Sequence, residues 1–216
     1  MKKIKLILFS LCLIFVNICV YGMNNVDSLY YSLMEQALKD FDSAKTLSEI
    51  IESKYKFERI SRIAPQEWLP TYYITYSTLR YVYNNSNDSE NNKLYLEEAK
   101  KHIGQLTKNA HADQSEIKTL LGYYYAALIL LDPKANGKKY SKEVLRSYKD
   151  ALKINPENPR AIILLAFFEQ RLPKFMKSKR NPKTEVAKAK ELFDKEEKNI
   201  HAPYWGRNYL NYVKLE

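Results

Sequence analysis

Apolar residues recur along the chain at intervals of three and four, which is the spacing of an amphipathic α-helix. The first stripe, Leu29, Leu33 and Ala37, predicts a helix over residues 26–41. Similar stripes predict helices over 47–63, 68–82, 94–106, 116–131, 141–154 and 161–171, and an eighth that begins at 184. Because β-branched and aromatic residues also fall at helical spacing rather than alternating, we expect an all-α chain without strands.

Polar runs and capping residues set the expected boundaries of these helices. Thr46 is a candidate cap for the second helix, and Ser141 and Thr184 are candidate caps for the sixth and the eighth. The run over 84–92 has no apolar residue and predicts an exposed loop, and residues 134–140 predict a short basic insertion.

The segment around residues 116–172 has the most regular organisation. The helix over 116–131 is apolar nearly all round, which is typical of a helix with neighbours on several sides. Further on, the two prolines of Asn155-Pro-Glu-Asn-Pro159 predict a tight turn between two helices. A succession of helix, turn, helix and turn is typical of a repeat protein.

This segment resembles a tetratricopeptide repeat (TPR). Leu121-Gly122 and Tyr125 supply the first part of the TPR pattern, and the second part is supplied by Val144, Tyr148, Ala151 and Pro156. Lys118 departs from the pattern, which often has Trp there, and about ten residues are inserted relative to its usual length. The resemblance implies a TPR-like α-solenoid of antiparallel helix pairs with a C-terminal capping helix.

Two further expectations concern packing in such a solenoid. Gly122 would lie where two helices cross closely, so a bulky residue there would overpack the crossing. Tyr204-Trp205 would close the open end of the array.

A wider resemblance is to exported repeat proteins of Bacteroidota, a family without an assigned activity. The segments that carry it are Phe57-Glu-Arg-Ile60, Glu67-Trp-Leu-Pro70, Leu121-Gly-Tyr-Tyr124, Asn155-Pro-Glu-Asn-Pro-Arg160 and Trp205-Gly206.

The first 22 residues have the pattern of a secretory signal peptide. Lysines at positions 2, 3 and 5 precede an uncharged run from Leu6 to Val20, with a possible cleavage site after Gly22. We therefore expect residues 1–22 to be a signal peptide, residues 23–216 to form a single helical repeat domain, and the protein to be exported to the periplasm or cell envelope. Removing this segment lowers the formal charge from +10 to +7.

The rest of the sequence offers little that could support a reaction. Both cysteines, Cys12 and Cys19, lie in the predicted signal peptide, and the three histidines are isolated from one another. Five glycines in the whole chain leave no phosphate-binding loop of the usual kind. We therefore expect no enzyme activity, no metal site and no cofactor, and export argues against nucleic acid as a target.

The function that we expect is recognition of a protein or peptide partner in the concave groove of the solenoid. If the repeat register holds, this groove is lined by Glu116, Thr119 and Tyr123 of one repeat and by Arg160 and Gln170 of the next. Two more positions, Ile163 and Phe167, line the groove or belong to the core between repeats. The abundant tyrosines, 18 in the chain, stack on a ligand or fill gaps between helices.

The alternative function is docking on an anionic membrane or glycan. The stretch over 171–183 is basic and has no helical pattern, so it predicts a loop that carries Lys174, Lys177, Lys179 and Arg180. A solvated loop without a partner fits the same pattern.

Overall fold

The computed structural model describes residues 27–214, and the predicted signal peptide lies outside them. Residues 27–43 form the first helix. The helices that follow are α2 (Leu47–Ile63), α3 (Trp68–Asn84), α4 (Ser89–Lys108), α5 (Gln114–Leu131), α6 (Pro133–Ile154), α7 (Pro159–Glu169) and α8 (Pro182–Lys195). Two short 3-10 helices, η1 (Lys174–Met176) and η2 (Arg207–Asn211), complete the order. No strand occurs within residues 27–214.

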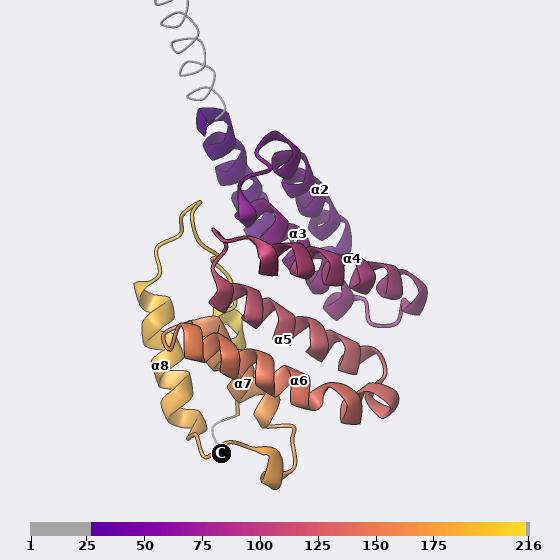
Figure 1. Cartoon of the computed structure of the whole chain (residues 1–216), viewed down its shortest axis with the longest axis vertical. Coiled ribbons are helices and arrows are strands. Elements are labelled where there is room, and N and C mark those ends of the chain that lie inside the picture. Colours follow the sequence, from indigo (N-terminus) through magenta and orange to yellow (C-terminus); the bar gives the residue numbers. More distant parts are fainter. Residues whose placement is uncertain (1–26, 215–216) are drawn as a thin grey trace, which may run out of the picture.

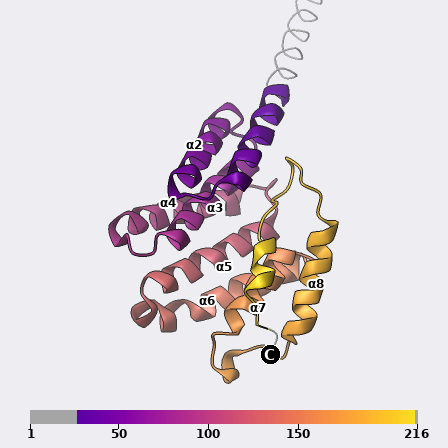
Figure 2. The same cartoon turned by 180° about the vertical axis from the view of Figure 1, so that it is seen from behind.

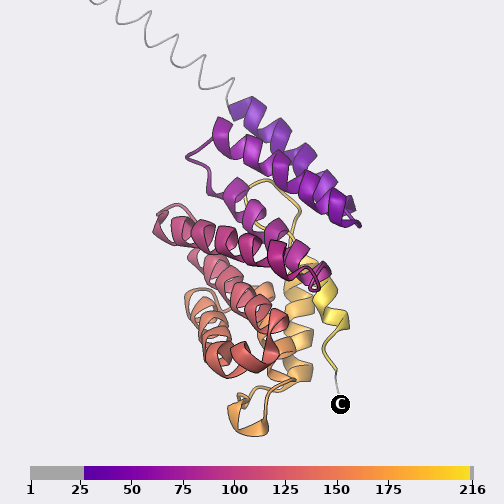
Figure 3. The same cartoon turned by 90° about the vertical axis from the view of Figure 1, so that its right-hand side faces the viewer.

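Consecutive helices pack as antiparallel pairs that stack on one another, as Figures 1 and 3 show. The first helix pairs with α2, α3 with α4, α5 with α6, and α7 with α8. Among α2 to α8, the pairing of α5 with α6 is the most extensive. The predicted all-α, TPR-like solenoid is therefore confirmed, and none of the described helices is both long and apolar enough to cross a membrane.

Local sequence explains where several helices begin. The Thr46 hydroxyl accepts a hydrogen bond from the Glu49 amide, and the Glu49 carboxylate accepts one in return from the Thr46 amide. This capping box satisfies two amides that have no partner within the helix, and α2 has the predicted bounds. At the predicted tight turn, Asn158 caps α7 and Pro159 occupies its first turn.

The polar run over 84–92 is only partly a loop, which corrects the prediction. Asp88 caps α4, whose first turn begins at Ser89. Asn92 is fully buried there, and its side-chain amide donates a hydrogen bond to the Asn85 carbonyl at 2.7 Å. Asn, Asp and Ser are favoured both in loops and at the start of a helix. The composition of this stretch therefore could not distinguish the two.

The basic stretch over 134–140 is helical rather than an insertion between helices. Asp132 caps α6 by accepting a hydrogen bond from the Ala135 amide at 2.9 Å, and Pro133 fits the first turn because that position needs no amide hydrogen. Ser141, the predicted cap, lies inside α6 and donates to the Gly137 carbonyl. Similarly, α8 is capped by Asn181 rather than by Thr184.

Helices α5 and α6 cross closely at Gly122. A Cβ atom at this position would lie 2.5 Å from Cε1 of Tyr148, whose ring is buried. Only glycine therefore lets the two helices approach with Tyr148 between them, as the sequence predicts.

The chain turns back after α8, and its C-terminal segment, residues 196–214, runs along the inner face formed by the first helix, α3, α5 and α7 (Figure 2). Trp205 stacks on Tyr76 of α3 with ring centroids 3.9 Å apart, and its indole donates a hydrogen bond to the Tyr72 hydroxyl at 2.8 Å. The prediction that Tyr204-Trp205 closes the open end of the array is therefore wrong. The indole is instead buried on the aromatic inner face, against Tyr76 and Tyr123.

Candidate ligand-binding site

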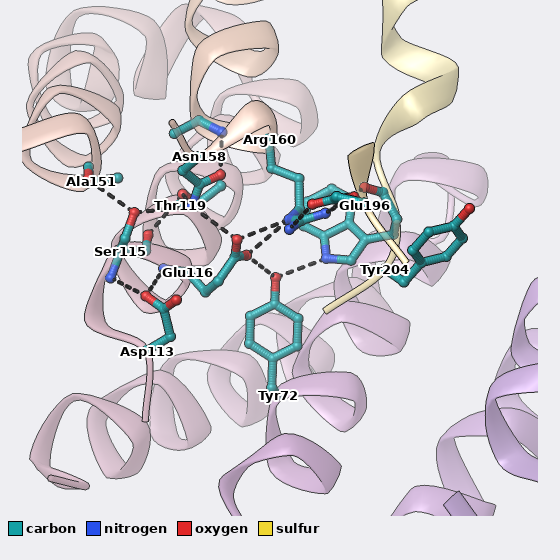
Figure 4. Close-up of polar contacts among 12 residues, drawn as sticks. Tyr72, Asp113, Ser115, Glu116, Thr119, Ala151, Asn158, Arg160, Glu196 and Tyr204 are labelled. Carbon is teal, nitrogen blue, oxygen red and sulfur yellow. Dashed lines mark hydrogen bonds and ion pairs between the residues drawn. The ribbon is translucent and has the colours of Figure 1, made fainter. Parts of the chain in front are cut away.

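Two of the predicted partner-binding residues, Glu116 and Arg160, meet in a buried polar network (Figure 4). The Arg160 Nε donates to both oxygens of the Glu116 carboxylate, at 3.0 and 3.1 Å. The same carboxylate accepts hydrogen bonds from the Tyr72 hydroxyl at 2.8 Å and from the Asn158 amide at 2.9 Å. The network thus joins α3, α5 and α7 at one point.

The remaining donors of Arg160 bind the C-terminal segment. Its Nη2 donates to the Glu196 carboxylate at 2.6 Å, and its Nη1 donates to the Trp205 carbonyl at 3.1 Å. Through these bonds Arg160 fastens the C-terminal segment to α7.

Burial and charge act in opposite directions on this network. Burial raises the pKa of Glu116. The Arg160 guanidinium and the Tyr72 hydroxyl stabilise the carboxylate and lower this pKa, but the effect of burial is larger. Burial lowers the pKa of Arg160, but the carboxylates of Glu116 and Glu196 outweigh this, so the net shift is upward. The buried pair of Glu116 and Arg160 thus positions α5 against α7.

The other predicted partner-binding residues also contact the chain itself. Thr119 is buried, and Tyr123 is buried with its hydroxyl 2.6 Å from that of Tyr209. The Gln170 side chain donates to the Lys214 carbonyl at 2.9 Å and accepts from the Lys214 amide at 3.1 Å. A partner in the groove could reach most of these residues only if the C-terminal segment moved away.

A pocket of about 440 Å³, which we call the aromatic pocket, opens between α5, α7 and η2. Its aromatic lining residues are Tyr83, Tyr123, Tyr148, Phe167, Phe168, Tyr209 and Tyr212. Aliphatic residues of α5 and α7 and Pro133 complete the walls, and Arg171 is the one charged residue among the lining residues described. The pocket therefore combines flat apolar walls with a single positive charge.

The aromatic rings of this pocket hold one another in place. Tyr83 and Tyr123 are stacked at 4.3 Å, and Tyr209 meets Tyr123 edge to face at 6.2 Å. The Tyr83 hydroxyl donates to the Tyr123 carbonyl at 3.1 Å. Burial raises the pKa of Tyr83 and Tyr123 well above the usual range and that of Tyr209 to about 12, so all three phenols are neutral at pH 7. The hydroxyls are satisfied within the chain, and the pocket presents ring faces and edges.

Arg171 lies at the rim of the aromatic pocket, just beyond the end of α7. Its guanidinium carbon is 3.8 Å from the centroid of the Phe167 ring, and Nη1 donates to the Phe167 carbonyl at 2.7 Å. The side chain is exposed, and no acidic residue within the described part of the chain forms an ion pair with it. Its remaining donors can therefore bind an anion.

Sequence reasoning identified only part of this pocket. It named Tyr123 and Phe167, but not Arg171 or the pair Tyr209 and Tyr212. The signal was an aromatic residue four positions before an arginine at the end of an apolar helix, a spacing that brings the two side chains together. The contribution of η2 carried no signal, because nothing local indicates that the C-terminal segment returns to α5.

The predicted basic loop is confirmed as an irregular segment between α7 and α8. Lys174, Lys177 and Lys179 are exposed, whereas Arg180 is half-buried and forms an ion pair with Glu185. Across residues 27–214, no group of three or more His, Cys, Asp or Glu side chains could hold a metal ion.

A scan of protein-family models finds no match to this chain, and no curated protein matches it either. A solved structure with a similar fold is the HusA haemophore from Porphyromonas gingivalis. The two chains are 24% identical and superpose with a TM-score of 0.74, over 85% of this chain and 90% of the other. The similarity extends over nearly the whole solenoid and establishes a shared fold.

Proposed function

We propose that this protein is an exported carrier that binds a flat, largely apolar molecule with an acidic group, of the porphyrin class, in the aromatic pocket. The observation that carries the proposal is the combination of stacked rings with one unpaired cation at the rim. The ligand is cargo rather than a cofactor, and we propose no reaction.

The walls of the pocket favour a flat conjugated ligand. Ring systems pack on tyrosine and phenylalanine in offset-stacked or edge-to-face arrangements, and both arrangements are already present among Tyr83, Tyr123 and Tyr209. The volume of about 440 Å³ lies in the range of small-molecule sites. The Tyr83 hydroxyl is bonded to the Tyr123 carbonyl, and the Tyr123 and Tyr209 hydroxyls are bonded to each other. The pocket would therefore recognise the shape and apolar surface of a ligand.

Arg171 supplies the polar part of the recognition. A guanidinium matches the geometry of a carboxylate and can form two parallel hydrogen bonds to it. Its contact with the ring of Phe167, another lining residue, keeps the group beside the pocket. A porphyrin with carboxylate side chains offers both features, and the likeness in fold to a haemophore supports that class of ligand.

The proposal is tested by titrating the purified protein with haemin, with iron-free protoporphyrin and with the dimethyl ester of protoporphyrin. We expect haemin and protoporphyrin to bind at micromolar concentration or below. The pocket would recognise the flat ring and the carboxylates of the ligand, and both ligands have these with or without iron. The ester should bind at least tenfold more weakly, since it lacks the charge that Arg171 would bind. Absorbance and tyrosine-tryptophan fluorescence report binding.

Variants of the pocket have matched controls elsewhere on the surface. Phe167→Ala and Arg171→Gln should each weaken protoporphyrin binding by tenfold or more, whereas Phe175→Ala and Arg146→Gln, which change exposed residues outside the pocket, should not. Circular dichroism verifies that each variant folds. Absence of saturable binding, or equal affinity in all four variants, would rule out the aromatic pocket.

Binding of a protein or peptide in the concave groove stays a prediction. The surface suits an extended segment, since residues 196–214 already lie on it. A partner would have to displace this segment or bind beside it, at the partly exposed Gln170.

A further inference from the structure

The loop that joins α7 to α8 has a composition that neither the packing of the solenoid nor the aromatic pocket explains. In Figures 1 and 3 it projects at the end of the molecule opposite the first helix. At its tip, in η1, the Phe175 side chain is 86% exposed, more than any other large apolar side chain within residues 27–214. A ring this exposed gains little from burial, so the packing of the fold does not require it.

Positive charge is concentrated in the sequence on both sides of Phe175. Residues 171–183 contain six lysines and arginines and no acidic residue. Of these six, Arg180 forms an ion pair, with Glu185. Lys174 is the first residue of η1 and Lys177 directly follows its last residue, and both are exposed, as is Lys179. The Lys177 ammonium also donates a hydrogen bond to the Gln170 carbonyl at 3.3 Å. The loop therefore carries an exposed apolar side chain with exposed lysines within four residues of it.

Hydrogen bonds fix the shape of the loop. The Glu169 carboxylate at the end of α7 accepts from the Ser178 amide at 3.1 Å and from its hydroxyl at 2.8 Å. Within η1, the Met176 amide donates to the Pro173 carbonyl at 2.9 Å, and the Lys177 amide donates to the Lys174 carbonyl at 3.2 Å. Because these hydrogen bonds already hold the loop in one shape, exposing Phe175 to a binding surface costs little conformational entropy.

We infer that this loop docks the protein reversibly on an anionic phospholipid bilayer. Phe175 inserts at the boundary between headgroups and acyl chains, and Lys174, Lys177 and Lys179 contact the lipid phosphates. An acidic protein surface would satisfy the lysines but would need a pocket for the protruding ring, whereas a bilayer accommodates both without a specific shape. With one apolar side chain and a few cations, the association is weak and sensitive to salt.

The inference does not depend on a porphyrin ligand, although the two surfaces adjoin. Arg171 is both the first residue of the basic loop and part of the rim of the aromatic pocket. Docking through Phe175 therefore brings the pocket to the membrane surface, where apolar ligands concentrate.

The test measures sedimentation of the purified protein with vesicles of phosphatidylglycerol and phosphatidylcholine, and with phosphatidylcholine alone. Replacing Lys174, Lys177 and Lys179 with glutamine should lower binding to the anionic vesicles by about a hundredfold, and Phe175→Ala by about tenfold. The matched control replaces Lys134, Lys138 and Lys139, three exposed lysines of α6, and has the same net charge. Any vesicle binding by the N-terminal segment is the same in all variants. Differences in binding between the variants therefore report the contribution of the loop.

A second measurement follows the tip of the loop directly. In Phe175→Trp, brominated anionic lipid should quench the added indole fluorescence, and high salt should abolish the quenching. Equal loss of binding in the control triple variant would mean that net charge alone attracts the protein, which overturns the inference. No quenching at position 175, or capture of the loop by an acidic protein without any vesicle binding, overturns it as well.

Discussion

Gly122 shows how one missing side chain determines the distance between two helices. The space that its Cβ would occupy is taken by the Tyr148 ring, which is buried and cannot swing out to solvent. Arg160 is the opposite case, a large side chain that the sequence predicts as a partner contact and that instead joins α7 to α5 and to the C-terminal segment. At the scale of the residue, burial decides what each group does.

We predict that Gly122→Ala destabilises the protein by about 1–3 kcal/mol, because the added methyl group pushes Tyr148 out of its place. The matched control is Gly104→Ala in α4, where a Cβ would meet nothing within 4 Å. That variant should gain about 0.5–1 kcal/mol from its better helix propensity. Urea denaturation measures both, and a shift of the two midpoints in the same direction would contradict the role given to Tyr148.

Helix α6 shows how a single cap changes the length of an element. Asp132 begins it with a hydrogen bond to the Ala135 amide, and residues 134–140 then continue as helix although their composition is that of a basic loop. The helix is longer than the repeat pattern requires, and its added turns provide Pro133 as part of the wall of the aromatic pocket.

Two substitutions test whether α6 is capped by Asp132, as observed, or by Ser141, as the sequence predicts. Asp132→Ala should cost about 1 kcal/mol of stability, since it leaves an amide of the first turn without a partner. Ser141→Ala should change stability by less than about 0.5 kcal/mol, because Ser141 lies inside the helix. Thermal unfolding followed by circular dichroism measures the difference, and a larger effect at Ser141 would place the helix start where the sequence predicts it.

The C-terminal segment determines the organisation of the whole molecule. It pairs Lys198 with Asp42 of the first helix, hydrogen bonds Trp205 to Tyr72 of α3, and fastens Lys214 to Gln170 beyond α7. A solenoid normally joins each repeat only to its neighbours. Here one segment links the first pair to the last, so we expect the repeats to unfold together.

Stability should fall steeply above pH 10, because burial raises the pKa of many tyrosines. Those shifted well above the usual range are Tyr72, Tyr76, Tyr83, Tyr123 and Tyr148. In the unfolded chain the same phenols ionise near pH 10. Their contribution is therefore complete below that pH and is lost as pH rises toward the folded-state values, by about 1.4 kcal/mol per pH unit for each tyrosine.

Tyrosinate absorbance checks this expectation. In the native protein these phenols should ionise only in a late step that coincides with loss of helical circular dichroism, whereas in urea all tyrosines should ionise together near pH 10. Native and denatured titrations of the same shape would mean that the tyrosines are accessible to solvent.

Local sequence was enough to predict the all-α class, the bounds of α2, the tight turn before α7 and the close crossing at Gly122. These features depend on apolar periodicity and on caps and turns that lie within a few residues of one another. It could not determine where the C-terminal segment lies, which polar residues are buried, or that tyrosines from η2 complete the aromatic pocket. Those depend on contacts between distant positions, such as Glu116 with Arg160, 44 residues apart, and Tyr72 with Trp205, 133 apart. The sequence around Arg160 would look the same whether its side chain were exposed or buried. Only the fold brings the carboxylates of Glu116 and Glu196 to it and so allows its charge to be buried.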